Sequence, residues 1–232
     1  MQILSLKDAI QARAPKILVY GDAGTGKTTL IASLRGRVLV LSAESGLLSL
    51  RGLDRVDGEG VDVVEIKTMS ELREAYALLR AGHDYQWIVL DSVSEIAEVV
   101  LLDEKAKTKD PRQAYGALQE QMTSLLRSFR DLSAGVYFSA KLNKSKDETT
   151  GRVSYGIGMP GAKLGEMVPY LFDEVFRLVI VEEERDGVKT TARYLQTASD
   201  ARSVAKDRSG RLDALEPADL GAVVAKITGE ST

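Results

Sequence analysis

Residues 16–28 read KILVYGDAGTGKT, a short apolar run that ends in a glycine-rich turn. The apolar run, 16–20, predicts a buried strand, and residues 27–34 continue with helical spacing. Between them, the pattern G-x-x-x-x-G-K-[ST] is matched at each fixed position, namely Gly21, Gly26, Lys27 and Thr28. A strand, a glycine-rich turn and a helix in this order predict a phosphate-binding loop, and the alternative is a Gly-rich turn that happens to carry Lys-Thr.

The residue types of this loop suit a triphosphate. Glycines let backbone N–H groups converge on phosphate oxygens, and the start of a helix adds its dipole. We expect Lys27 to reach the β- and γ-phosphates and the hydroxyl of Thr28 to ligate Mg²⁺. The predicted nucleotide-binding residues are Gly21, Asp22, Ala23, Gly24, Thr25, Gly26, Lys27, Thr28 and Thr29.

Two acidic residues follow strand-like runs further along the chain. Residues 87–91 read WIVLD, so an apolar strand delivers Asp91 at its carboxyl end, where open α/β sheets bind ligands. We expect Asp91 to hold Mg²⁺ through a water molecule. Glu44 ends the run RVLVLSAE and is the candidate to orient or deprotonate an attacking water. The alternatives are an Asp91 that caps the next helix and a Glu44 that stabilises a helix dipole.

Strand-length apolar runs alternate with segments of helical spacing along the chain. This order predicts an α/β fold with a mostly parallel sheet flanked by helices. The last two strands, 173–181 and 192–196, predict an antiparallel hairpin at one edge. Residues 103–112 and 142–163 are expected to be irregular loops, which are often functional. The other predicted strands are 37–41, 61–66, 86–90 and 136–139, and the other helices are 70–80, capped by Ser70, and 112–132.

The chain shows no Pro/Ser-rich linker, so we expect a single domain over residues 15–228. Residues 1–14 carry apolar side chains that are suited to contact a neighbouring subunit. The absence of cysteine excludes disulfides and thiolate metal sites. No apolar run reaches the roughly 18 residues of a membrane span, and no signal peptide is evident, which predicts a cytoplasmic protein without a membrane partner. A net charge of −3 gives no overall attraction for nucleic acid, so such a partner would need a local basic patch.

Together these residues resemble the RecA-like branch of P-loop ATPases, which implies ATP and Mg²⁺ as cofactors. In that branch a glutamate follows the second strand, as Glu44 does, and the metal strand ends in Asp-Ser, as Asp91-Ser92 does. The strand before the second loop ends in a polar sensor of the γ-phosphate, and the matching residue here is Lys141.

Residues 205–210, AKDRSG, resemble the Lys-x-Arg element of ring helicases. The resemblance implies that Lys206 and Arg208 reach the γ-phosphate of a neighbouring subunit, as arginine fingers do. Such head-to-tail contacts give homo-oligomeric rings or helical filaments. The alternative is a solvated basic turn.

A narrower resemblance, over residues 15–226, is to phage-encoded Sak-type single-strand annealing proteins. It rests on the motifs GDAGTGKTTL, SAESG, YGIGMPGAKL and AKDRSG. The resemblance implies single-stranded DNA binding, annealing of complementary strands in phage recombination inside the bacterial host cell, and a single-strand binding protein as partner.

The segment from Lys141 to Lys163 supplies the local basic patch. Its basic side chains outnumber Asp147 and Glu148, and Tyr155 and Met159 offer stacking surface. Solvated mobile loops are the alternative. The predicted DNA-binding residues are Lys144, Lys146, Arg152, Tyr155 and Lys163, and the first loop adds Lys105, Lys107, Lys109 and Arg112.

Two other functions remain open at this level. A protein-remodelling ATPase of the AAA+ type would need a helical lid, and residues 200–232 look short for one. A P-loop kinase would use the segments 103–112 and 142–163 to close over an acceptor.

Overall fold

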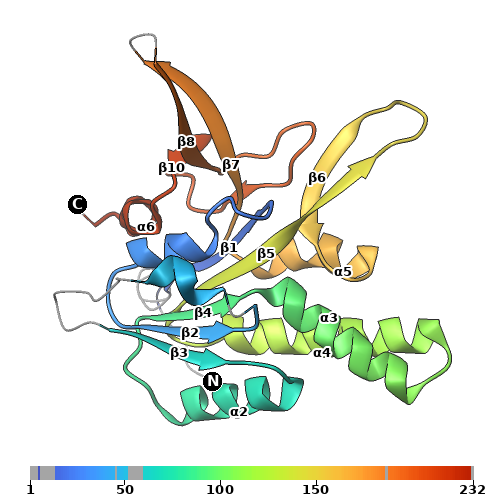
Figure 1. Cartoon of the computed structure of the whole chain (residues 1–232). Coiled ribbons are helices and arrows are strands. Elements are labelled where there is room, and N and C mark those ends of the chain that lie inside the picture. The colour runs from blue at the N-terminus through green and yellow to red at the C-terminus, as the bar shows by residue number, and fades with distance from the viewer. Residues whose placement is uncertain (1–4, 6–13, 45, 52–59, 186–187, 231–232) are drawn as a thin grey trace.

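The computed structural model describes residues 5, 14–44, 46–51, 60–185 and 188–230. Its centre is a ten-stranded sheet in which eight strands follow the order β10-β8-β7-β1-β5-β4-β2-β3, while β6 pairs with β5 and β9 with β7 (Figure 1). The strands are β1 (Lys16–Gly21), β2 (Val38–Ser42), β3 (Val61–Glu65), β4 (Trp87–Asp91), β5 (Gly135–Lys146), β6 (Val153–Gly158), β7 (Glu174–Arg185), β8 (Val188–Gln196), β9 (Lys206–Asp207) and β10 (Leu215–Pro217).

The middle of the sheet is parallel. Pairs β3–β2, β2–β4, β4–β5, β5–β1 and β1–β7 all run in the same direction. Strands β8 and β10 are antiparallel and form one edge. Because parallel strands bring their carboxyl ends to one edge, Gly21 lies opposite Lys141, and Ser42 lies opposite Asp91. The predicted mostly parallel sheet with an antiparallel edge hairpin is confirmed.

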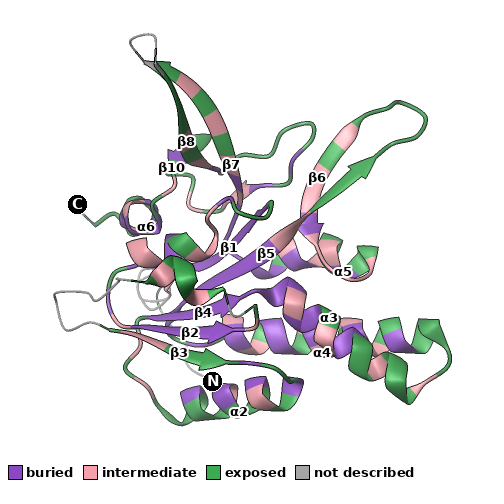
Figure 2. Ribbon diagram, viewed as in Figure 1, coloured by how far each residue is buried: buried purple, intermediate pink, exposed green. Residues whose placement is uncertain are grey.

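Helices cover both faces of the sheet and bury two hydrophobic clusters (Figures 1 and 2). The apolar run 17–20 of strand β1 is buried on both faces of the sheet: Leu18 and Tyr20 face one cluster, Ile17 and Val19 face the other, and all four side chains are fully buried. The α-helices are α2 (Met69–Ala81), α3 (Val93–Lys107), α4 (Pro111–Arg130), α5 (Ala162–Met167) and α6 (Leu220–Thr228). The 3-10 helices are η1 (Thr28–Ser33), η2 (Leu47–Leu50) and η3 (Val168–Leu171).

Several predicted boundaries are wrong. The helix after the phosphate loop is the six-residue 3-10 helix η1. Helix α2 is capped by Thr68 and not by Ser70, because Thr68 and Glu71 form a reciprocal capping box. The predicted loop 103–112 is mostly helical: α3 continues to Lys107, and α4 begins at Pro111 after the cap Asp110. The charged residues there lie on exposed helical turns, where sequence polarity resembles that of a loop.

The predicted irregular segment 142–163 is largely a β-hairpin. Strand β5 continues past the sheet core to Lys146, and β6 returns antiparallel beside it. The turn is fixed by Asp147, whose carboxylate accepts hydrogen bonds from the backbone N–H groups of Thr149 and Thr150. This hairpin projects from the body of the molecule (Figure 1). Polar residues on an exposed ribbon lack the apolar alternation that identifies a strand in sequence.

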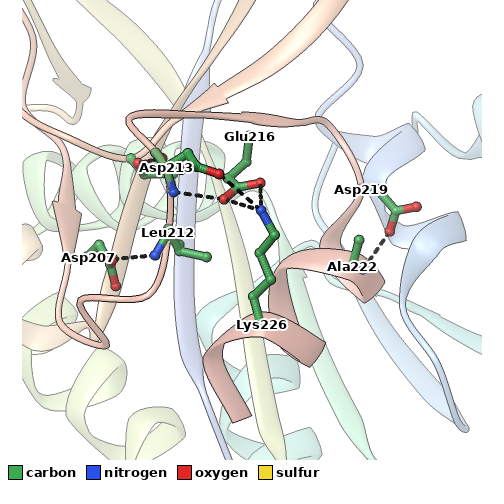
Figure 3. A network of polar contacts seen from close by, with 8 residues as sticks. Asp207, Leu212, Asp213, Glu216, Asp219, Ala222 and Lys226 are labelled. Atoms are coloured by element: carbon green, nitrogen blue, oxygen red, sulfur yellow. Dashed lines mark hydrogen bonds and ion pairs between the residues drawn. The ribbon is translucent and has the colours of Figure 1, made fainter. Parts of the chain in front are cut away.

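The C-terminal helix α6 is held on the sheet by packing and by an ion pair. Leu220 and Val223 belong to the same cluster as Leu30 of η1. Lys226 donates to both carboxylate oxygens of the buried Glu216, at 2.8 and 2.7 Å, and Glu216 also accepts from the backbone N–H of Asp213 (Figure 3). The helix therefore lies against η1.

Most of the N-terminal segment 1–14, predicted to contact a neighbouring subunit, lies outside the described residues. Across the ranges that the structure describes, no helix combines the length and the apolar character required to cross a membrane.

Candidate functional site: a phosphate loop beside an acidic strand end

The phosphate loop spans the turn between β1 and η1. Gly26 has φ +104°, in the left-handed region that favours glycine. The hydroxyl of Thr25 donates to the carbonyl oxygen of Asp22 over 2.9 Å. The Nζ atom of Lys27 donates to the carbonyl oxygens of Gly21 and Asp22 at 3.0 and 2.9 Å. The lysine side chain thus folds back over the loop, where it can meet phosphate oxygens.

The predicted metal ligands lie in direct contact. The hydroxyl of Thr28 donates to Oδ2 of Asp91 over 2.7 Å, and the hydroxyl of Ser139 on β5 donates to Oδ1. Asp91 is only 2% exposed, so its carboxylate needs positive charge nearby. Carboxylate and hydroxyl oxygens suit Mg²⁺, which usually takes few protein ligands together with waters and substrate phosphates. Among the described residues, no group of three or more Asp, Glu, His or Cys side chains is placed to hold a metal ion.

Glu44 lies beside this pair. The hydroxyl of Ser92, the residue after Asp91, donates to Oε1 of Glu44. Burial lowers the pKa of Lys27, while the charges of Glu44 and Asp91 oppose that shift. Both acids therefore act electrostatically on the phosphate-loop lysine. Glu44 is itself exposed.

Lys141 lies at the same edge but in the middle of β5 rather than at its end. It pairs in register with Gly21, and its Nζ atom forms ion pairs with Glu95 and Glu98 of α3 at 2.7 and 3.1 Å. The hydrogen bond to Glu95 is the main reason why the pKa of Lys141 is raised. The expected strand end at this position is wrong, because the chain continues into the hairpin. A role in sensing the γ-phosphate stays a prediction.

Lys206 and Arg208 lie at the other end of the sheet. Lys206 pairs with Val175, and β7 begins beside the start of β1. The Nζ atom of Lys206 donates to the carbonyl oxygens of Pro169 and Phe172, and Arg208 pairs with Asp173 at 2.7 Å. Neither side chain lies at the phosphate loop of the same chain. Their predicted action on a neighbour's nucleotide stays a prediction.

The predicted DNA-binding side chains gather on and beside the β5–β6 hairpin. Lys144, Lys146 and Arg152 are exposed on it, and Lys163 is exposed on α5. Tyr155 is not free for stacking on both sides, because the guanidinium of Arg177 lies 3.8 Å from its ring centroid. Of the basic residues predicted on the first loop, Lys105 and Lys107 lie in the last turn of helix α3 and not on a loop.

Three residues of the site are absent from the sequence prediction. The hydroxyl of Tyr137 donates to the carbonyl oxygen of Lys27 over 2.7 Å, Ser139 binds Asp91, and Nε of Arg193 donates to the carbonyl oxygen of Thr25 over 2.9 Å. Tyr137 and Ser139 alternate in the predicted strand VYFS, so strand periodicity could have placed both on one face. Arg193 carries no such signal, because only the tertiary fold brings β8 beside the loop.

The comparisons with known proteins agree with this geometry. A family model described as an AAA domain matches residues 13–209, which include the phosphate loop, Glu44, Asp91 and the Lys206–Arg208 pair. No curated protein matches the chain. The phosphate loop, the Thr28–Asp91 contact and this match lead to one assignment. The chain belongs to the AAA domain family and carries a P-loop ATPase-type, nucleotide-binding domain.

Proposed function

We propose that this protein is a RecA-like ATPase that binds ATP with Mg²⁺, assembles into homo-oligomers, and binds single-stranded DNA to promote annealing or recombination. In this proposal Lys27 binds the phosphates, Thr28 and Asp91 hold Mg²⁺, and Glu44 orients the attacking water. A single-strand binding protein is the expected partner, and the host cytoplasm is the expected location.

One observation carries the DNA-binding part of the proposal. The β-strand β5 contributes residues both to the nucleotide site and to the basic hairpin that is proposed to bind DNA. Ser139 binds the metal ligand Asp91, and Lys141 lies opposite Gly21 of the phosphate loop. The same strand then leaves the sheet and presents Lys144 and Lys146 to solvent. DNA phosphates held by these lysines would therefore be linked to the ATP site through the polypeptide backbone of β5.

The neighbourhood of the hairpin also offers an aromatic surface. Tyr170 on η3 is 81% exposed and lines a groove with Gly156 and Met159. Lys206 lines the same groove. Because bases stack on exposed aromatic rings, Tyr170 is a better stacking candidate than Tyr155, whose ring already contacts Arg177.

The test combines nucleotide turnover with DNA binding. We expect the protein to bind an oligo-dT strand at low salt, with weaker binding as salt rises, and to change its ATPase rate when DNA is added. Replacing Lys144, Lys146 and Arg152 together by Ala should reduce DNA affinity by about tenfold or more, since each phosphate contact adds to the salt-dependent affinity. Basal ATPase activity should persist.

A matched control removes the same charge elsewhere. Lys67, Arg80 and Lys189 are exposed basic residues away from the β5–β6 hairpin. The triple Ala variant at these positions should bind DNA like the unmodified protein. If both triple variants lose the same affinity, the binding reflects overall charge; if the unmodified protein binds no DNA at low salt, the DNA-binding proposal is refuted.

The structure offers less support for the two rival functions. In the described residues after β9, α6 is the only helix, and it packs against η1 instead of forming a helical lid. Residues 208–230 therefore form no helical lid of the kind that a protein-remodelling ATPase would use. The segments proposed to close over a kinase acceptor are largely the regular elements α3, β5 and β6.

A further inference from the structure

Arg193 on β8 lies against the phosphate loop without belonging to its motif. Its Nε atom donates to the carbonyl oxygen of Thr25 over 2.9 Å. A Cβ atom added at Gly26 would lie 3.2 Å from the same Nε, so the arginine packs closely on the loop glycine. Although close to the loop, Arg193 remains exposed.

The cation of Arg193 has no acidic partner within the described part of the chain. No carboxylate there pairs with its guanidinium, and its remaining N–H donors have no hydrogen-bond partner among those residues. A guanidinium has five donors in a planar fork and readily stacks on aromatic rings. Only one donor is used by the loop, so most of this group is available to a ligand.

The arrangement of strands indicates which part of a nucleotide lies there. The metal ligands Thr28 and Asp91 mark the β,γ-phosphate end, and Asp91 belongs to β4, two strands away from β1. Strands β7 and β8 lie on the opposite side of β1. A triphosphate that crosses the loop from the metal side therefore brings its nucleoside end toward β8, where Arg193 lies.

An apolar side chain accompanies the arginine. Ile180 on β7 is the direct cross-strand partner of Arg193, so the two side chains share one face of the sheet. Ile180 is 49% exposed. A planar guanidinium stacks on the face of an aromatic ring, and an exposed aliphatic side chain beside it adds apolar contact area for a heterocyclic base.

We propose that Arg193 and Ile180 form the nucleoside subsite of this protein, in which the guanidinium of Arg193 stacks on the base of the bound nucleotide. The subsite rests on nucleotide binding at the phosphate loop and is independent of DNA binding. Arg193 also ties β8 to the carbonyl oxygen of Thr25, so the subsite and the phosphate loop form a single surface.

The experiment compares a ligand that has a base with one that lacks it. Calorimetric titration with Mg²⁺ present measures the affinity for ATP and for inorganic tripolyphosphate. Arg193→Ala should weaken ATP binding by about tenfold, in line with one desolvated cation–π contact and the tenfold equivalence of about 1.4 kcal/mol. Tripolyphosphate binding should be unchanged, and Ile180→Ser should show the same selectivity with a smaller loss.

Matched controls separate the possible failures. Lys189→Ala removes a positive charge from the same strand and should alter neither affinity. An equal loss of both ligands in Arg193→Ala would show that the arginine only shapes the loop, and unchanged ATP binding would show that it contacts no base; either result overturns the subsite. If the unmodified protein binds neither ligand, the proposal that nucleotide binds at the phosphate loop is refuted, which is a different outcome from failure of the nucleoside subsite alone.

Discussion

The hydroxyl of Thr28 donates a hydrogen bond to Oδ2 of Asp91 over 2.7 Å across a separation of 63 residues. Thr28 begins η1, directly after the phosphate loop, and Asp91 ends β4. The strand that precedes the loop, β1, is not a neighbour of β4 in the sheet, because β5 lies between them. Ser139 of that intervening strand binds the other carboxylate oxygen of Asp91. Two separate elements, η1 and β5, thus converge on the acidic group that a third, β4, delivers at the carboxyl edge of the sheet.

Replacing Asp91 by Asn tests the role of this acid in metal binding. The amide keeps the size of the side chain but removes the charge that Mg²⁺ requires. We expect ATP turnover to fall by about a hundredfold or more, since the metal neutralises charge that develops during phosphoryl transfer. The measurement is ATPase rate together with ATP affinity in Mg²⁺ and in a chelator.

The difference between those two conditions is the informative quantity. In the Asn variant, ATP affinity should depend little on Mg²⁺, whereas the unmodified protein should bind more tightly with the metal. A variant that keeps its full Mg²⁺ dependence would contradict the assignment of Asp91.

Replacing Glu44 by Gln tests the proposed water-orienting residue. Ser92 holds Glu44 at the edge of the site, and the amide preserves an oxygen that can accept this bond. We expect turnover to fall by about 10²–10⁴-fold, the usual contribution of a general base, while ATP affinity is retained. Single-turnover hydrolysis and equilibrium binding measure the two effects, and turnover within about twofold of the unmodified protein would assign the role to another group.

Complementation between two inactive variants tests the action of Arg208 across subunits. Arg208 pairs with Asp173 at the amino end of the sheet, far along β1 from the phosphate loop. Arg208→Ala should bind ATP but hydrolyse it slowly, and Lys27→Ala should not bind ATP. If a mixture of the two regains ATPase activity, an intact loop and an intact arginine have met at a shared interface.

The outcomes of the mixture differ clearly. If Arg208→Ala keeps normal turnover, Arg208 has no role in hydrolysis and only forms a surface ion pair with Asp173. Low turnover that is not rescued in the mixture would place its role inside its own subunit.

The buried Glu174, which lies on β7 opposite Asp207 of β9, predicts a pH dependence of stability. Burial, followed by the charge of Asp207, raises the pKa of Glu174 from 4.5 to about 8. The folded protein therefore binds a proton that the unfolded chain releases near pH 4.5, so this group contributes stability that is full below that pH. The contribution is lost as the pH rises through about 8.

Thermal unfolding of Glu174→Gln from about pH 5 to about pH 8.5 measures this contribution. Each unit of pKa shift corresponds to about 1.4 kcal/mol, so the unmodified protein should lose stability over this range and the Gln variant should lose less. Glu166→Gln, which changes an exposed carboxylate, is the matched control. Parallel pH profiles for Glu174→Gln and the unmodified protein would contradict a protonated Glu174.

Sequence patterns predicted the elements that contiguous residues specify without a distant partner. Residues 16–28 predicted β1 and the phosphate loop because an apolar run and fixed glycines need no distant partner to be identified. The positions of Asp91 and Glu44 followed from the rule that parallel strands align their carboxyl ends. Helix α3 was not among the predicted helices. Its charged end and the hairpin β5–β6 were expected to be loops, because exposed polar side chains give the same pattern in a loop, a ribbon or a charged helical turn.

The sequence by itself determined that a triphosphate loop follows a buried strand in an α/β sheet, since apolar periodicity and the glycine pattern are properties of contiguous residues. Only the tertiary structure decided which side chains surround that loop. Ser139 reaches Asp91 because β5 lies between β4 and β1, and Arg193 reaches Thr25 because β8 is placed beside β7. Strand order fixes these contacts, and it arises from long-range packing that no short stretch of sequence contains.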